Sequence, residues 1–191
     1  MPKLKTGLTT SHHALLGLLS LKPAHGYDLL RMLHGDTGAG RIVPLKPATL
    51  YAILHDLQAR GLIKGQLLSD SYPPRTLFSP TELGQEVFRK WLAEPVRRIR
   101  EVRSDFLLKI YFAALLAPEE GLRLLDRQIQ VIESYVQNLS AELPLYAPDS
   151  FDYLVVESKL TAAQNTQVWL ERHRQRLEAS DKSSIRNEQA V

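Results

Sequence analysis

The 191-residue chain contains no cysteine. Without thiols it can build no disulfide framework, no cysteine zinc site and no thiolate nucleophile, and this composition agrees with a reducing compartment. The chain also lacks any uninterrupted apolar run near the roughly 18 to 20 residues that span a bilayer, and no secretory signal precedes a cleavage-like site. We therefore expect a cytoplasmic protein with no membrane partner.

Signals for catalysis and for metal binding are missing as well. The sequence has no glycine-rich phosphate loop, no nucleophile elbow and no histidine set beside an evident acid and nucleophile. Four histidines lie near the N-terminus, but none forms the i, i+4 pair with a carboxylate that marks a helical metal site: His12, His13, His25 and His34. We expect no enzyme, no cofactor and no metal.

The charge is small but unevenly distributed. The net charge is +3, with 44% hydrophobic and 24% charged residues, as in an ordinary globular protein. Residues 1–95 hold 11 Lys and Arg against 7 Asp and Glu, a balance of +4, whereas residues 96–191 hold 13 against 14, a balance of −1. The positive excess of the N-terminal half favours binding to the phosphate backbone of a nucleic acid, and it supports the motif evidence that follows.

The segment that begins at Pro47 has the pattern of a DNA-recognition helix. Proline is favoured at a first helical position, and apolar residues follow at the i, i+3, i+4, i+7 spacing of one helix face: Leu50, Ile53, Leu54 and Leu57. The other side carries small or hydrogen-bonding residues that let a helix approach base edges in the major groove: Ala48, Thr49, Tyr51, Ala52, His55 and Ala59. Gly61 is expected to end this helix.

A β-hairpin is predicted directly after this helix. Strands are expected from Leu62 to Leu68 and from Arg75 to Ser79, around a polar, proline-containing tip at residues 69–74. Two shorter helices precede the recognition helix, and a helix with Ser79 as N-cap follows the hairpin. Three helices, a hairpin and a further helix make up a winged helix-turn-helix, which we expect over residues 1–95.

Six residues of this domain are candidate DNA contacts. We expect Thr49 and His55 to read bases, and Lys46 and Arg75 to hold phosphates, with Lys64 as a further phosphate contact. Tyr51 either touches DNA or packs at the edge of the core, and the same two interpretations apply to Tyr27.

Residues 96–191 follow a different pattern. After a helix that ends at Leu116, apolar residues at alternating steps of three and four predict a coiled-coil seam: Leu122, Leu125, Ile129, Ile132, Val136, Leu139 and Leu143. A last helix repeats the spacing less regularly, from Tyr153 to Leu177. Two such seams joined by a short loop predict an antiparallel pair, with apolar surface left for a second copy of the chain. We expect a helical dimerisation domain over residues 96–179 and a disordered tail over 180–191.

Aromatic residues near the junction of these two parts are candidates for an effector pocket: Trp91, Phe106, Tyr111, Tyr153 and Trp169. A small aromatic or phenolic compound would suit such walls. The competing interpretation is that these rings only pack the core, as aromatics at helical spacing usually do.

Four stretches of the N-terminal half form a recognisable set: Leu15-Leu16-Gly17-Leu18-Leu19, His25-Gly26-Tyr27-Asp28-Leu29, Ala48-Thr49-Leu50-Tyr51, and Leu57 through Gly61-Leu62-Ile63 with Arg75 to Thr81 and Gly84. With these stretches the N-terminal half resembles the PadR family of bacterial transcriptional regulators. The C-terminal half is similar in length and pattern to the helical domain of the family's longer members. Departures are Ala48 where glycine is usual, Ala52 where proline often follows the tyrosine, and Thr76-Leu77-Phe78 in place of a basic-aromatic-aromatic run.

The resemblance implies a mostly α fold with a small β-hairpin, and a homodimer that binds a palindromic site on double-stranded DNA. It also implies a ligand-responsive repressor, because repression is the family's usual mode. The alternative is a winged-helix adaptor that contacts proteins and not DNA. Steeply salt-dependent DNA binding distinguishes the two, since only phosphate contacts produce it.

Overall fold

The computed structural model describes residues 7–35, 38–68 and 75–188, with side chains described up to residue 179. The predicted hairpin tip at 69–74 therefore lies outside the described residues. The elements in chain order are α1 (Thr10–Leu21), β1 (Ala24–His25), α2 (Gly26–His34), the 3-10 turn η1 (Gly38–Arg41), α3 (Pro47–Ala59), β2 (Ile63–Leu68), β3 (Arg75–Pro80), α4 (Glu82–Ala93), α5 (Ile99–Glu101), the π-helical turn η2 (Val102–Phe106), α6 (Leu107–Leu116), α7 (Pro118–Glu142), the 3-10 turn η3 (Leu143–Leu145) and α8 (Phe151–Glu188).

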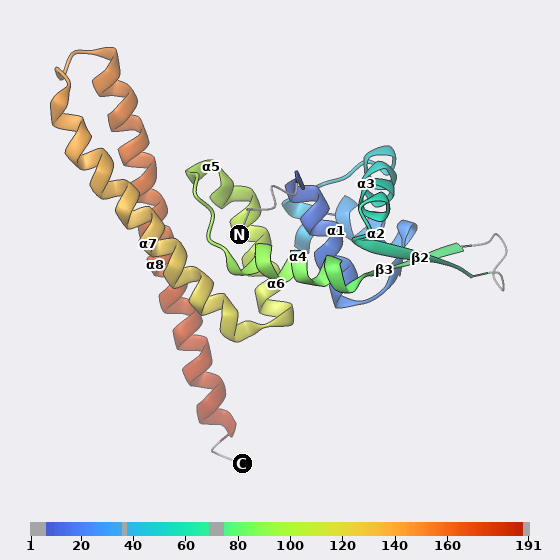
Figure 1. Cartoon of the computed structure of the whole chain (residues 1–191). Coiled ribbons are helices and arrows are strands. Elements are labelled where there is room, and N and C mark those ends of the chain that lie inside the picture. Colours follow the sequence, from blue (N-terminus) through green and yellow to red (C-terminus); the bar gives the residue numbers. More distant parts are fainter. Residues whose placement is uncertain (1–6, 36–37, 69–74, 189–191) are drawn as a thin grey trace. The chain divides into compact units, whose positions relative to one another are not determined.

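The chain divides into two compact units, and the division differs from the one expected at residue 95. The first unit comprises Met1–Glu94 and Arg103–Ala117, and the second comprises Pro95–Val102 and Pro118–Val191. Helix α6, expected in the C-terminal domain, packs on α1 and α4 of the first unit (Figure 1). The reason is Phe112, which is fully buried and fits against Gly17, where an added Cβ would lie 2.4 Å from the phenyl ring.

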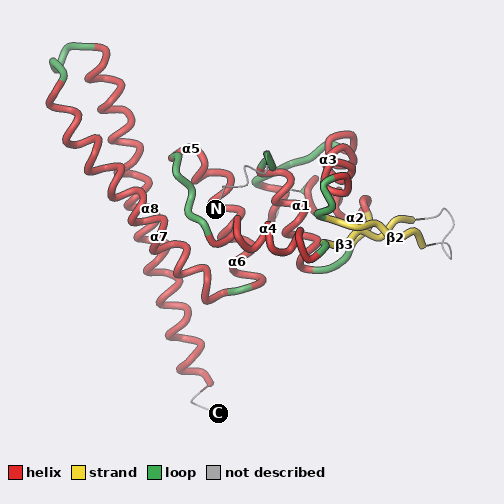
Figure 2. Tube along the Cα trace, in the orientation of Figure 1, coloured by secondary structure: helices red, strands yellow, loops and turns green. Residues whose placement is uncertain are grey.

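The first unit is a winged helix-turn-helix, as predicted. One hydrophobic cluster joins α1, α2, α3, α4 and α6. Beside it lies an antiparallel sheet in the order β1-β3-β2, in which β2 and β3 form the wing that projects from the helices (Figure 2). The strand β1 was not expected from the sequence, and it pairs Ala24 with Phe78 and His25 with Leu77.

Helix α3 ends as its glycine predicts. Gly61 has a φ of 68°, in the left-handed region that favours glycine. Its N–H donates to the carbonyl of Gln58 at 2.9 Å, and the N–H of Leu62 donates to the carbonyl of Leu57 at 2.9 Å. These two bonds form a Schellman motif, which satisfies the last carbonyls of the helix and directs the buried Leu62 into the wing.

The cap of α4 lies two residues later than predicted. Strand β3 continues through Pro80, so Ser79 belongs to the sheet, where it pairs with Lys64. Thr81 is the N-cap instead, because its hydroxyl accepts the Gly84 N–H at 3.1 Å and donates to the Gly61 carbonyl at 2.7 Å.

The second unit contains the predicted antiparallel pair of long helices, α7 and α8, which lie side by side (Figure 1). Its seam is the predicted one: Leu125, Ile129, Ile132 and Leu139 are buried on α7, and Val156, Ala163 and Leu170 are buried on α8. Helix α8 continues to Glu188, where a disordered tail from Ser180 was expected, and the remaining residues 189–191 lie outside the described chain. Among the described helices, none is both long and apolar enough to cross a membrane.

Candidate nucleic-acid interface

Helix α3 presents the face that the sequence assigned to DNA. Leu50, Ile53, Leu54 and Leu57 are buried, as their spacing predicts. On the other side, Thr49, Tyr51 and His55 are exposed beside the exposed alanines 48, 52 and 59. Lys46 is the exposed N-cap residue before Pro47. The outer face of α3 is thus narrow, hydrogen-bonding and accessible, as groove entry requires.

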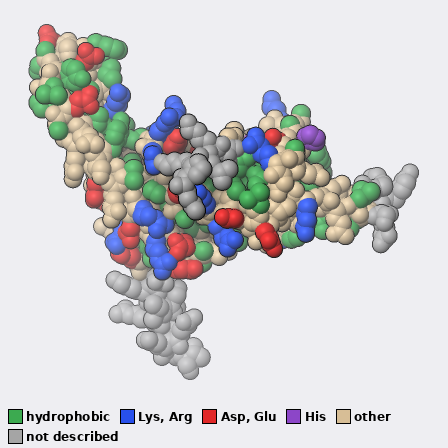
Figure 3. Space-filling view, viewed as in Figure 1, with side chains coloured by type: hydrophobic (Ala, Val, Ile, Leu, Met, Phe, Trp, Pro, Cys, Tyr) green, Lys and Arg blue, Asp and Glu red, His purple; other side chains and the backbone are tan. Residues whose placement is uncertain are grey.

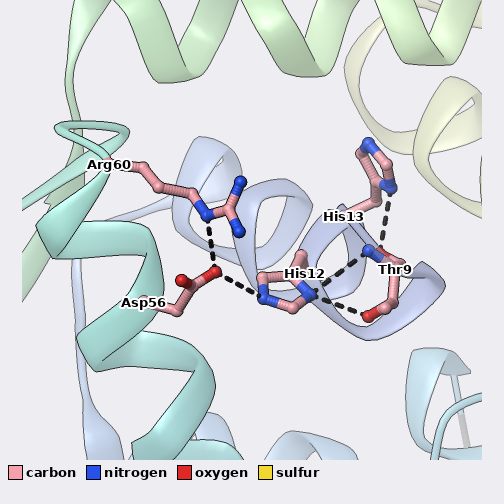
Figure 4. A network of polar contacts seen from close by, with 5 residues as sticks. All are labelled: Thr9, His12, His13, Asp56 and Arg60. Atoms are coloured by element: carbon pink, nitrogen blue, oxygen red, sulfur yellow. Dashed lines mark hydrogen bonds and ion pairs between the residues drawn. The ribbon is translucent and has the colours of Figure 1, made fainter. Parts of the chain in front are cut away.

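A polar network fixes the last turns of α3 against the start of α1 (Figure 4). The Thr9 N–H donates to Nδ1 of His12 at 3.3 Å, so this nitrogen is the acceptor and neutral His12 carries its proton on Nε2. From there it donates to Oδ2 of Asp56 at 3.0 Å, and Arg60 Nε donates to the same oxygen at 2.7 Å. This network holds the last turns of α3 against the start of α1.

The Asp56 carboxylate is the centre of this network. The hydrogen bond from Arg60 is the main cause that lowers the pKa of Asp56 below its usual value, and the contact with His12 acts in the same direction. Asp56 therefore stays ionised, and the guanidinium of Arg60 compensates its negative charge while His12 donates a hydrogen bond to it.

The wing places its two cations on one face of the hairpin. In the antiparallel register Lys64 pairs with Ser79 and Leu68 pairs with Arg75, and side chains alternate along each strand. Lys64 and Arg75 therefore share a face, with Lys64 near the helices and Arg75 near the hairpin end. Both are exposed. The opposite face carries the buried Ile63 toward the core.

A cleft of about 680 Å³ lies within the first unit where the start of α2, the first turns of α3 and strand β3 meet. Its walls include His25, Tyr27, Asp28, Tyr51, Arg75 and Thr76. Of the six candidate DNA contacts, the cleft brings together Tyr51 and Arg75. It does not include Lys46, Thr49, His55 or Lys64.

Basic side chains do not form one continuous patch on the surface seen in Figure 3. Lys and Arg are interspersed there with Asp and Glu. Ion pairs on the first unit show the same mixing, for example Arg31 with Asp28 at 3.6 Å and Arg60 with Asp56. The face seen in Figure 3 therefore presents a polyanion with no continuous basic surface.

The aromatic candidates for an effector pocket divide between the two units. Trp91, Phe106 and Tyr111 belong to the first unit, and Tyr153 and Trp169 belong to the second. Phe106 is fully buried, and Trp91 stacks on His13 with ring centroids 4.4 Å apart. Tyr111 meets Phe112 edge-on at 5.1 Å, and Trp169 stacks on His173 at 5.9 Å. Each of these contacts is ordinary packing within its own unit.

Sequence reasoning missed two walls of the cleft, His25 and Thr76. They are joined by a hydrogen bond of 3.0 Å from His25 Nδ1 to the Thr76 carbonyl. The strand that brings them together is two residues long, and so short a strand has no periodicity to detect. Among the described residues, no group of three or more His, Asp or Glu side chains is placed to hold a metal ion.

Comparison with known proteins agrees with this geometry. Residues 15–90 match the Transcriptional regulator PadR-like family, and residues 102–178 match the family described as Virulence activator alpha C-term. The chain is 26% identical over 170 residues to the negative transcriptional regulator PadR of Bacillus subtilis (strain 168), which covers 83% of this chain and 92% of that protein.

Solved structures of Bacillus subtilis PadR are also similar. Its complex with operator DNA has a TM-score of 0.44 at 22% identity, covering 91% of this chain and 98% of that chain. Its complex with p-coumaric acid has a TM-score of 0.41 at 24% identity, covering 89% and 99%.

The buried and exposed faces of α3, the capped turn after it and the projecting hairpin define a winged helix-turn-helix protein. Residues 15–90 of this unit match the PadR-like family of transcriptional regulators. The homologues are transcriptional regulators and not enzymes.

Proposed function

We propose that this chain is a sequence-specific repressor that binds a palindromic operator as a homodimer. The observation that carries the proposal is the exposed face of α3, on which Thr49 and His55 stand among alanines beside the cationic wing. In this proposal Thr49 and His55 read base edges, while Lys46, Lys64 and Arg75 contact phosphates. The name of the Bacillus subtilis relative, a negative transcriptional regulator, supports repression.

The test is to sequence the DNA fragments that the purified protein enriches from its own genome, and then to measure affinity for one enriched duplex and one random duplex across a salt series. Arg75→Ala should lower the affinity for both duplexes by a similar factor. It should also reduce the slope of log affinity against log salt concentration by about one unit. His55→Ala should relax preference at one base position. Equal losses on both duplexes for both variants would contradict this assignment, and salt-independent binding would favour the adaptor alternative.

The homodimer is proposed to form through the second unit. Several large apolar side chains of this unit remain exposed, at 78% for Leu145, 76% for Phe151, 57% for Leu154 and 49% for Val168. Hydrophobic side chains also gather at the loop end of the α7–α8 hairpin in Figure 3. Exposed apolar surface of this kind is typical of a protein contact, and a symmetric pair of recognition helices requires a second copy.

Sedimentation analysis tests the dimer. Val168→Glu and Leu154→Glu should shift the chain toward monomer and weaken binding to a palindrome. The matched control is Leu83→Glu on α4, a leucine that is 50% exposed in the first unit. Deletion of residues 149–191 should lower solubility as well as association, because it uncovers the seam of α7. Full dimerisation by the two α8 variants would place the interface elsewhere.

We further propose that a small aromatic acid is the effector. The candidate contacts are taken within each unit separately: Trp91, Phe106 and Tyr111 in the first unit, and Tyr153 and Trp169 in the second. Support comes from the related Bacillus subtilis PadR, which is described in complex with p-coumaric acid. Release from DNA requires that the ligand bind the DNA-free arrangement more tightly. Single-tryptophan variants, Trp91→Phe and Trp169→Phe, allow each fluorescence signal to be followed with operator binding during titration with p-coumaric acid. Quenching without loss of DNA affinity would mean a site without regulatory coupling.

A further inference from the structure

The cleft beside the recognition helix has a chemistry of its own, which goes beyond the contacts assigned above and depends on the proposed DNA-binding function. Its walls come from α2, α3 and β3 of the first unit, and they combine phenol, imidazole and guanidinium groups. The phenols of Tyr27 and Tyr51 are the largest exposed groups among these walls, with 70% and 52% of each residue accessible.

Tyr51, which is carried by α3, packs against the start of α2. A Cβ built on Gly26 would lie 2.7 Å from Cε1 of Tyr51 and 3.1 Å from its hydroxyl oxygen. The ring therefore rests on the bare backbone of Gly26, with the hydroxyl beside the first residue of α2. This close approach accounts for glycine at position 26, and Tyr51 lines the cleft together with Tyr27.

The wing side of the cleft is fixed in place by His25. Its Nδ1–H donates to the Thr76 carbonyl at 3.0 Å, and its backbone is in register with Leu77 of β3. The start of α2 and the strand that carries Arg75 are thereby joined. Arg75 lines the cleft one residue before Thr76.

The charge of the cleft favours an anion. Asp28 is the one acid among the lining residues, and Arg31 on the next turn of α2 lies 3.6 Å from its carboxylate. Arg31 offsets Asp28, so the guanidinium of Arg75 leaves a local excess of one positive charge. Phenol and guanidinium groups are donors that proteins use for phosphate oxygens, and such contacts carry no base identity.

We propose that this cleft holds one phosphodiester of the DNA backbone, with Arg75 as the cation and the hydroxyls of Tyr27 and Tyr51 as donors. Tyr51 then donates a hydrogen bond to the DNA backbone and not to a base, and Tyr27 is a further DNA contact. The cleft fixes the register in which the outer face of α3 meets the bases, because the site spans the recognition helix and the wing at once.

Hydroxyl deletion is the first test. Tyr27→Phe and Tyr51→Phe keep the rings and remove one oxygen each. Each should weaken binding to an enriched duplex and to a random duplex by the same factor, about threefold to tenfold, as expected for the loss of one ordinary hydrogen bond. Tyr135→Phe, which removes a hydroxyl from α7 in the second unit, is the matched control and should leave both affinities unchanged.

Neutral DNA linkages provide the second test. Single phosphates of the enriched duplex are replaced in turn by methylphosphonate, and one position should weaken binding by the wild-type chain. At that position alone, Tyr27→Phe, Tyr51→Phe and Arg75→Ala should cause little further loss, because they act on the phosphate already neutralised. A second route is Gly26→Ala, which displaces the Tyr51 ring and should imitate Tyr51→Phe on both duplexes.

The outcomes separate the two levels of the proposal. Failure of the wild-type chain to bind any duplex would overturn the proposed function together with the subsite. Normal binding by the wild-type chain, with both Tyr→Phe variants unchanged or with losses only on the enriched duplex, would overturn the phosphate subsite and leave the function standing. Losses that add at every methylphosphonate position would also overturn the subsite.

Discussion

Acidification should destabilise the first unit through His13. This residue is 6% exposed on α1, its ring stacks on Trp91, and its Nδ1–H donates to the Thr9 carbonyl at 3.0 Å. Burial lowers the pKa of His13 from its usual 6.5 to about 4; the negative charge of Asp105 opposes this shift and the positive charge of Lys109 assists it. Folded His13 is therefore neutral at pH 5, whereas in the unfolded chain it is mostly protonated.

The direction and the size of this pH effect on the free energy of unfolding follow from proton linkage. The unfolded state binds more protons than the folded state between about pH 6.5 and pH 4, so the contribution is fully present above pH 6.5 and is lost as the pH falls through this window. From pH 7 to pH 5 the free energy of unfolding should fall by about 2 kcal/mol because of this residue alone.

The measurement is urea unfolding at pH 7 and pH 5, followed by Trp91 fluorescence in a Trp169→Phe background. His13→Phe keeps an aromatic ring beside Trp91 and cannot titrate, and every other acid and histidine contributes equally to both proteins. The wild-type chain should lose about 2 kcal/mol more than the variant between the two pH values. Parallel losses in the two proteins, or an imidazole of His13 that titrates near pH 6.5 by NMR, would refute the reasoning.

Three further substitutions test local features by urea unfolding. Gly61→Ala should lower the free energy of unfolding by about 1 kcal/mol. The loss comes from backbone conformation alone, because an added Cβ has no atom within 4 Å. An unchanged free energy of unfolding would mean that the left-handed turn is not required. Thr81→Ala should cost about 1 to 2 kcal/mol because the Gly84 N–H loses its cap, and an unchanged midpoint would place the cap elsewhere. Asp126→Asn should change stability by less than about 1 kcal/mol, and not at all in high salt, because its pair with Arg174 is exposed; a larger, salt-resistant loss would contradict this.

Elements with a long apolar period were predictable from the sequence. The spacing from Leu50 to Leu57 identified the buried face of α3, and the alternating steps from Leu125 to Leu139 identified the seam of α7. These patterns are reliable because burial of one helix face is decided by the residues of that helix alone. The turn at Gly61 was predictable for a related reason, since few residues other than glycine adopt its conformation.

The placement of α6 was not predictable in the same way. Its sequence is apolar on several sides, so its own periodicity does not say which unit it joins. The decision rests on Phe112 and Gly17, two residues 95 positions apart, one of which supplies a ring and the other the space for it. The buried Lys109 is explained only by the fold as well, since its ammonium donates to the carbonyls of Trp91 and Glu94 at the end of α4.

The aromatic residues near the junction show how a residue type can suggest a role that contacts decide. Trp91 was a candidate because an indole near a junction suits a ligand wall, yet its ring lies between His13 on one side and the Lys109 ammonium, 4.7 Å from the ring centroid. Stacking with an imidazole and a cation–π contact are sufficient reason for a tryptophan at this position. A ligand at Trp91 would have to replace at least one of these contacts.

Some candidate DNA contacts could be assigned from the sequence alone, whereas others could be assigned only from contacts between elements of the folded chain. Thr49 and His55 follow from the outer face of one helix, and their exposure depends on that helix alone. Tyr51 lies on the same helix, but its ring rests on Gly26 of another helix. The strand that brings Arg75 to the same cleft is joined to α2 through a strand of only two residues. A helix pattern therefore identifies the residues that can face DNA, whereas the assignment of a side chain to base or backbone depends on neighbours from other elements. Tyr51→Phe and Thr49→Ala should differ accordingly. The first should lower the affinity for all duplexes alike, and the second should lower the affinity for the enriched duplex selectively.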